Sequence, residues 1–168
     1  LEDGGIIRNV SNTNEVSSLV NTQDMNDADF YIGGIAGEIT GTIENVQNSG
    51  RVKHVGTIME DETSIGGIAG WIRGEMRNVS NTGEIISDIR SANALSETSV
   101  EIGGILGTGK HGSKISNAYN AGNLTAYLDG GRSDISLGGI AGTLAGIVSK
   151  SSSITSAYNT GNLSGTIG

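Results

Sequence analysis

The chain has 168 residues, a length that suits one domain, and it contains 28 glycines, no proline and no cysteine. Its formal net charge of −8 argues against nucleic acid or an anionic membrane surface as a partner, and the lack of cysteine excludes disulfides and thiolate metal sites. The longest apolar run, 137–148, is shorter than the roughly 20 residues that cross a bilayer, so we expect no membrane insertion.

The glycines and the shortage of aromatic residues predict an unusual interior. A glycine inside a regular element costs roughly 0.5–1 kcal/mol relative to alanine, so this many glycines indicate bends or close backbone contacts that require them. Aromatic residues make up 4% of the chain, and we therefore expect a core of Ile, Leu, Val and Ala.

Two short blocks alternate along the chain. The second block comes first, as IRNVSNTNEV at 7–16, without a first block before it. Four full copies follow: IGGIAG (32–37) with IENVQNSGRV (43–52), IGGIAG (65–70) with MRNVSNTGEI (76–85), IGGILG (102–107) with ISNAYNAGNL (115–124), and LGGIAG (137–142) with ITSAYNTGNL (154–163). The first blocks start 33, 37 and 35 residues apart.

This spacing predicts one solenoid domain over 1–168, a fragment of a larger protein. We place a partial first repeat at 1–31 and full repeats at 32–64, 65–101, 102–136 and 137–168.

Within each repeat the pattern predicts short strands joined by sharp bends. Ile43 and Val46 lie three positions apart, whereas Val46 to Val52 alternate, which is typical of two strands on either side of a bend. Ile32 is out of phase with Ile35 across a Gly-Gly bend, where glycine permits positive φ and close approach of coils. The sequence therefore predicts an all-β parallel β-helix (β-solenoid) of about four to five coils, for which we expect right-handed winding.

Stacked coils would place equivalent residues in columns. One column is apolar and faces inward: Ile35, Ile68, Ile105 and Ile140. Two columns are amides: Asn9, Asn45, Asn78 and Asn117, ending in Ser156, and Asn12, Asn48, Asn81, Asn120 and Asn159. We interpret both as structural ladders whose side chains bond along the stack and to the bends. A sugar or calcium site is the alternative, which so regular a pattern disfavours.

One stretch partly matches two nucleotide-binding motifs. Residues 103–114, GGILGTGKHGSK, fit the opening of a P-loop and also G-x-G-x-x-G. The repeat accounts for Gly103, Gly104 and Gly107, and His111 stands where a P-loop needs Ser or Thr. We therefore expect strands and turns here, and no cofactor.

The residue types that carry chemistry are sparse. His54 and His111 are the two histidines, and H-E-x-x-H does not occur, so we predict surface histidines and no zinc peptidase site. Two acidic groups, Asp24, Asp27 and Asp29, and Glu60, Asp61 and Glu62, predict solvated loops, with calcium binding or a catalytic pair as alternatives. Trp71, the single tryptophan, predicts either a partner or sugar contact or a cap on the core.

The blocks resemble the GLUG repeat family over about residues 32–168. The similarity lies in GGIAG followed by AYNTGNL, with Tyr158, Asn159, Gly161 and Asn162, and in AYNAGN at 118–123; NVQNSG and NVSNTG of the earlier copies lack the tyrosine. Such repeats occur in large secreted or wall-attached bacterial proteins that look like adhesins. Some resemble immunoglobulin A1-specific zinc metallopeptidases, where the repeats lie outside the catalytic domain. The resemblance implies an extracellular, non-catalytic module at the bacterial cell surface and supplies no catalytic residue.

Three functions follow as hypotheses. The first is a structural or adhesive module that presents loops to a host protein or glycan. The second is an accessory segment that positions substrate for a metallopeptidase domain in the rest of the parent chain. The third is a carbohydrate-active β-helix enzyme, which would need clustered carboxylates and more aromatic residues than this chain has.

Overall fold

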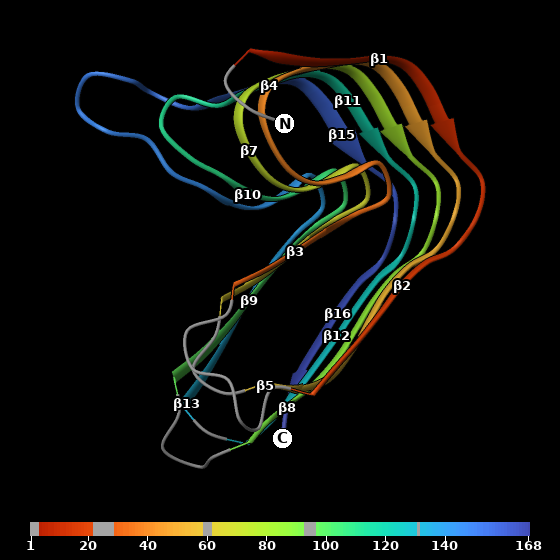
Figure 1. Ribbon diagram of the computed structural model, residues 1–168, viewed down its shortest axis with the longest axis vertical. Coiled ribbons are helices and arrows are strands. Elements are labelled where there is room, and N and C mark those ends of the chain that lie inside the picture. Colours follow the sequence, from red (N-terminus) through yellow and green to blue (C-terminus); the bar gives the residue numbers. More distant parts are fainter. Residues whose placement is uncertain (1–3, 22–28, 59–61, 93–96, 131) are drawn as a thin grey trace.

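The computed structural model describes residues 4–21, 29–58, 62–92, 97–130 and 132–168. In this part of the chain the fold is a parallel β-solenoid of about four turns without a helix, which confirms the predicted fold class. Viewed in Figure 1, equivalent strands of successive coils overlie one another from the N-terminal end, in red, to the C-terminal end, in blue.

The strands follow the repeat. A half coil contains β1 (Gly5–Asn12) and β2 (Val16–Asn21). The first and second full coils contain β3 (Phe30–Gly33), β4 (Ala36–Asn48) and β5 (Val52–Ile58), then β6 (Glu62–Gly66), β7 (Ala69–Asn81) and β8 (Ile85–Ser91). The third contains β9 (Glu97–Gly103), β10 (Leu106–Gly109), β11 (Lys114–Asn120) and β12 (Leu124–Asp129). The fourth contains β13 (Arg132–Gly138), β14 (Ala141–Leu144), β15 (Ser153–Asn159) and β16 (Leu163–Ile167).

Three parallel sheets run along the stack. Sheet A contains β1, β4, β7, β10, β11, β14 and β15; sheet B has the order β16-β12-β8-β5-β2; and sheet C has the order β13-β9-β6-β3. The register joins equivalent residues of the repeat, so that Ile7, Ile43, Met76, Ile115 and Ile154 form one continuous column.

The interior is divided into two aliphatic cores. The strands of sheet A follow a curved path (Figure 1). They enclose the first core, in which Ile68 and Ile105 are fully buried and Ile35 and Ile140 are partly buried, as expected of the inward isoleucine column. The second core lies between sheets B and C and includes Ile65, Ile89 and Ile102. Isoleucine dominates both cores because its β-branched side chain packs well on a pleated surface.

Gly-Gly pairs separate the two cores, and close approach explains them. A Cβ on Gly67 would lie 2.3 Å from the Gly104 carbonyl oxygen and 2.4 Å from Cγ of Asn81. The expectation of positive φ at these bends is wrong: the glycines with positive φ are Gly4, Gly41, Gly74, Gly112 and Gly130, none of them in a first block. Elsewhere in the coil, non-glycine residues, chiefly the asparagines of the second blocks described below, adopt the left-handed backbone.

The stretch that fits nucleotide-binding motifs consists of strands and a turn. Residues 103–114 include β10, a turn that contains Lys110 and His111, and the start of β11, so this stretch holds no helix to bind a phosphate.

The Gly67 contact yields a stability prediction. Gly67→Ala should lower the free energy of unfolding by about 3 kcal/mol, because the new methyl group must displace Asn81 or the neighbouring coil. Urea denaturation followed by circular dichroism measures the change.

Gly165→Ala is the matched control, since its Cβ would meet nothing closer than 3.7 Å. It should leave stability unchanged or raise it slightly. Equal losses in the two variants would contradict the close-approach explanation.

Candidate functional site

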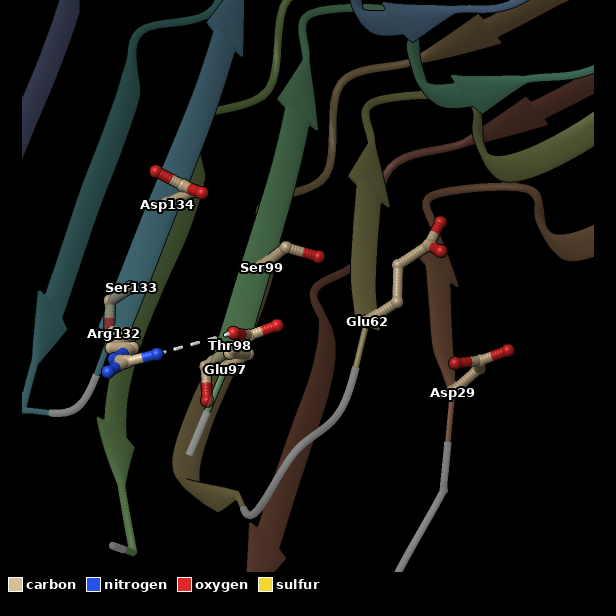
Figure 2. Close-up of a pocket in the computed structure, with 8 residues that line it drawn as sticks. All are labelled: Asp29, Glu62, Glu97, Thr98, Ser99, Arg132, Ser133 and Asp134. Carbon is tan, nitrogen blue, oxygen red and sulfur yellow. Dashed lines mark ion pairs between the residues drawn. The ribbon is translucent and has the colours of Figure 1, made fainter. Parts of the chain in front are cut away.

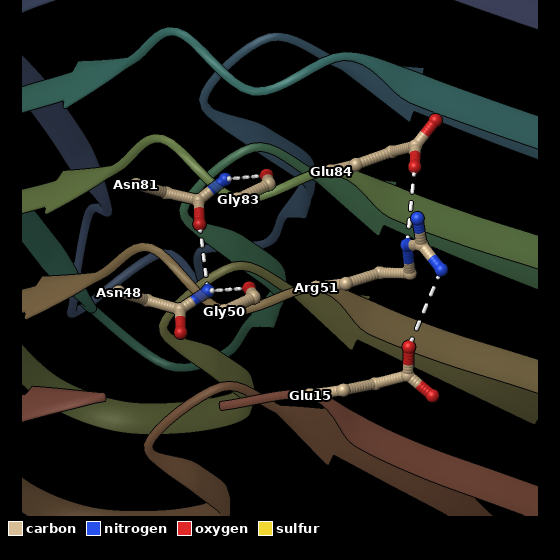
Figure 3. Close-up of polar contacts among 7 residues, drawn as sticks. All are labelled: Glu15, Asn48, Gly50, Arg51, Asn81, Gly83 and Glu84. Atoms are coloured by element: carbon tan, nitrogen blue, oxygen red, sulfur yellow. Dashed lines mark hydrogen bonds and ion pairs between the residues drawn. The ribbon is translucent and has the colours of Figure 1, made fainter. Parts of the chain in front are cut away.

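The second asparagine column forms a buried hydrogen-bond ladder. Nδ2 of each residue donates to Oδ1 of the equivalent residue in the next coil, at 2.9, 2.8, 2.9 and 2.6 Å from Asn12 to Asn159. The same nitrogen of Asn48 and of Asn81 donates at 2.8 Å to the carbonyl oxygen two residues on, at Gly50 and Gly83 (Figure 3). Both amide N–H groups are thus occupied, which is how a polar group is tolerated in the interior.

The first asparagine column lies on the outer surface of sheet A. Asn9, Asn45, Asn78 and Asn117, and Ser156 at the end of the column, have φ between 51° and 56°. This left-handed backbone lets Ile43 and Val46 both point inward although they are three positions apart, and asparagine tolerates it better than most residues. Nδ2 of Asn78 donates to Oδ1 of Asn45 at 2.9 Å, and Nδ2 of Asn117 donates to Asn78 at 3.0 Å.

A column of charged residues follows the buried ladder (Figure 3). Arg51 lies between Glu15, at 3.3 Å, and Glu84, at 3.2 Å, one residue from each neighbouring coil. All three side chains are about half exposed, between 41% and 50%, so these ion pairs add little stability. These ion pairs join equivalent positions of neighbouring coils, so we interpret them as support for the coil register.

A shallow groove of about 540 Å³ lies beside the outer asparagine column. Its other side is formed by the column that contains Gln47, Ser80, Tyr119 and Tyr158, which are paired in register. The rings of Tyr119 and Tyr158 stack with their centroids 4.6 Å apart. None of the described residues that line the groove carries a charge.

A second cleft, of about 720 Å³, lies on the outer face of sheet C. Figure 2 shows Asp29, Glu62, Ser99 and Asp134 on four neighbouring strand paths, one from each coil. Nearby, Arg132 pairs with Glu97 at 3.9 Å. In the described part of the chain, no three His, Cys, Asp or Glu side chains are arranged to hold a metal ion.

The predicted acidic groups are represented here only in part. Asp29 is exposed and accepts a hydrogen bond from the Tyr31 hydroxyl at 3.0 Å, while Glu62 lies 4.0 Å from the Lys110 ammonium. Asp24, Asp27, Glu60 and Asp61 lie outside the described residues.

Trp71 belongs to neither core. It lies on β7 in register with Glu38 and Thr108, is half-buried, and has its ring centroid 6.1 Å from that of Tyr31. Burial, the hydrogen bond to Asp29 and nearby carboxylates raise the pKa of the Tyr31 hydroxyl. The two aromatic side chains form a pair where sheets A and C meet, so the indole is partly covered by its own protein.

The prediction of a surface position is wrong for His54. Its side chain is fully buried in β5, its ring centroid lies 5.8 Å from that of Phe30, and neither ring nitrogen has a hydrogen-bond partner. The reason is strand alternation, since His54 follows the inward Val52 by two positions. Burial lowers the pKa of His54 to about 4. His111 is exposed in a turn, with φ of 56°.

Glu101 is a titratable group that the sequence patterns do not single out. It is half-buried on β9, and its Oε2 atom has no partner. Burial, followed by the negative charge of Glu62, raises the pKa of the Glu101 carboxyl to about 7. Sequence reasoning also missed the groove beside Tyr119, although outward positions two residues beyond each outer asparagine recur in every repeat.

Comparisons with protein-family models, with curated proteins and with solved structures find no match to this chain. No helix that could cross a lipid bilayer occurs among the residues that the structure describes. The site must therefore be interpreted from its own chemistry.

The two asparagine columns should respond differently to substitution. Asn81→Ala should lower the free energy of unfolding by about 3 kcal/mol, because it removes the donor to the buried Gly83 carbonyl, the acceptor for Nδ2 of Asn48 and one of the two donors to Oδ1 of Asn120. Asn78→Gly, which keeps the left-handed backbone at an exposed site, should cost about 1 kcal/mol or less. Thermal and urea unfolding distinguish the two, and a larger loss in Asn78→Gly would contradict the assignment of the columns.

His54 should make stability depend on pH on the acid side. Its pKa is lower in the folded chain than the ordinary 6.5, so protonation favours the unfolded chain and stability is lost as pH falls from about 6.5 to about 4. His54→Phe removes this titration. As pH falls from about 6.5 to about 4, the free energy of unfolding of the variant should therefore rise relative to that of the native protein by up to about 3 kcal/mol. Urea unfolding at a series of pH values measures the difference.

Glu101→Gln provides the opposite control. The pKa of the Glu101 carboxyl is raised in the folded chain, so its contribution to folding stability is fully present below about pH 4.5 and is lost as pH rises to about 7. The free energy of unfolding of Glu101→Gln should therefore rise relative to that of the native protein as pH approaches neutrality, and not as pH falls. A constant difference at every pH, in either variant, would contradict the assigned titrations.

Proposed function

We propose that this chain is a non-catalytic structural and adhesive repeat module of an extracellular bacterial surface protein, of the GLUG type. The observation that carries the proposal is the buried asparagine ladder, which continues through every second block without interruption. A ladder of identical links serves coil stacking, and it lengthens when coils are added without any change in geometry. A rigid rod that holds surfaces away from a cell is the function such a stack suits best.

Placement of the module outside the cell rests on the resemblance of AYNAGN and AYNTGN to repeats of secreted and wall-attached proteins. Adhesion is supported by the two open clefts, one neutral on sheet A and one acidic on sheet C, which present polar side chains from several coils at once. A partner that contacts equivalent positions in successive coils gains from each of them.

Binding assays test this proposal. The purified chain, coated on beads, should bind saturably to at least one member of a panel of host extracellular-matrix proteins and glycans. Beads that carry an unrelated globular protein of similar net charge are the control.

A folded chain that binds nothing on the panel would refute adhesion. Release of reducing sugar from a polysaccharide by the native chain, lost in Glu101→Gln, would instead support a carbohydrate-active enzyme, because a carboxyl with a raised pKa can act as a general acid.

A further inference from the structure

The groove on sheet A differs chemically from the rest of the molecule. The chain carries a net charge of −8, yet the described lining of this groove is uncharged amide, hydroxyl, aromatic and aliphatic surface. Its volume of about 540 Å³ lies in the range of roughly 300–1,000 Å³ that is common for ligand sites. A ligand without charge is therefore favoured over an anion or a cation.

Its asparagines retain hydrogen-bonding capacity, unlike those of the buried ladder. Each side-chain amide has two N–H donors and an oxygen with two lone pairs. Asn78 uses one donor toward Asn45 and accepts one bond from Asn117, which leaves a second donor and a second lone pair at an exposed position. In the buried column, Asn81 uses both donors, toward Asn120 and Gly83. The outer column therefore offers an amide donor and acceptor to solvent in each coil that has an asparagine here, and a hydroxyl at Ser156 in the fourth coil.

The opposite side of the groove offers aromatic surface. Tyr158 is 60% exposed and stacks on Tyr119, whose hydroxyl lies 3.2 Å from Oγ1 of Thr160. Aromatic rings provide large contact areas at a small entropic cost, and their faces attract weakly positive C–H groups. Amides that bind hydroxyl groups, beside rings that contact C–H faces, are the combination that recognises sugars.

We propose that this groove binds an extended, uncharged polysaccharide that runs along the stack, with about one sugar unit per coil. Coils repeat at the strand spacing of roughly 4.7–4.9 Å, and a pyranose unit of an extended β-1,4-linked chain advances by a similar length. Asn45, Asn78, Asn117 and Ser156 then meet four successive sugars. This inference deepens the proposed adhesive function and rests on it. For the outer asparagine column it replaces the purely structural ladder expected from the sequence with the sugar site that was its alternative.

Isothermal titration calorimetry with defined oligosaccharides tests the inference. The probes are β-1,4-linked di-, tetra- and hexasaccharides of glucose, N-acetylglucosamine and mannose, with polygalacturonate as the anionic comparison. At least one neutral series should bind, with affinity that rises from the disaccharide to the tetrasaccharide and then levels off, because the groove spans four coils. Polygalacturonate should bind more weakly than that series.

Substitutions locate the site. Tyr158→Ala and Asn117→Gly should each weaken binding about tenfold, whereas Tyr158→Phe, which keeps the ring, should change it by about threefold or less. Tyr127→Ala is the matched control, since Tyr127 is another exposed tyrosine, on sheet B and away from the groove. Asn117→Gly preserves the left-handed backbone, and circular dichroism verifies that each variant is folded.

Three results would overturn the inference: no binding of any neutral series, equal losses in Tyr158→Ala and Tyr127→Ala, or a preference for polygalacturonate. Its failure is distinguishable from that of the proposed function. If the oligosaccharides do not bind but the coated beads still bind a host protein, adhesion stands and only the groove assignment falls.

Discussion

The contact between the buried asparagine column and the Gly-Gly column that faces it is the constraint on which the solenoid depends. Asn81 lies between Val79 of the first core and Ile85 of the second, at the level where the two cores meet. Only a glycine at position 67 leaves room for this amide, and the equivalent asparagines of the two neighbouring coils and the Gly83 carbonyl satisfy it. Close packing and hydrogen bonding therefore require each other, and together they impose the register on all three sheets.

The same residue type serves two purposes because its surroundings differ. In the interior, asparagine is fully bonded and contributes only to the stack. On the surface of sheet A, the left-handed backbone at Asn45, Asn78 and Asn117 holds the amides outward, where part of their hydrogen-bonding capacity faces solvent. A bend that the fold needs in every coil thus produces, as a consequence, a regular row of polar side chains with hydrogen-bonding capacity toward solvent.

Stability is unevenly distributed between the two cores. The buried polar atoms without a partner, among the residues described, belong to His54, Thr63, Ser87, Thr98 and Glu101. All of these lie in sheets B and C, and none lies in sheet A, which forms the proposed binding groove. Each such group costs about 1–3 kcal/mol. Those of His54, Thr63, Ser87 and Thr98 are in phase with the second core, whereas Glu101 lies on the opposite face of β9 from Val100 and Ile102. Sheets B and C are therefore the less well satisfied part of the fold and the part that responds to pH. The groove is built on the better satisfied half of the coil.

The sequence alone determined the repeat, the parallel solenoid and the inward isoleucine column, because stacking identical units forces equivalent residues such as Ile68 and Ile105 to overlie. It did not determine that His54 is buried, that Trp71 packs against Tyr31, or that Tyr119 and Tyr158 border a groove beside exposed asparagines. These features depend on which faces of a coil oppose each other across the interior and where its outer surface is concave. That information resides in the path of the whole coil, and no single strand pattern contains it.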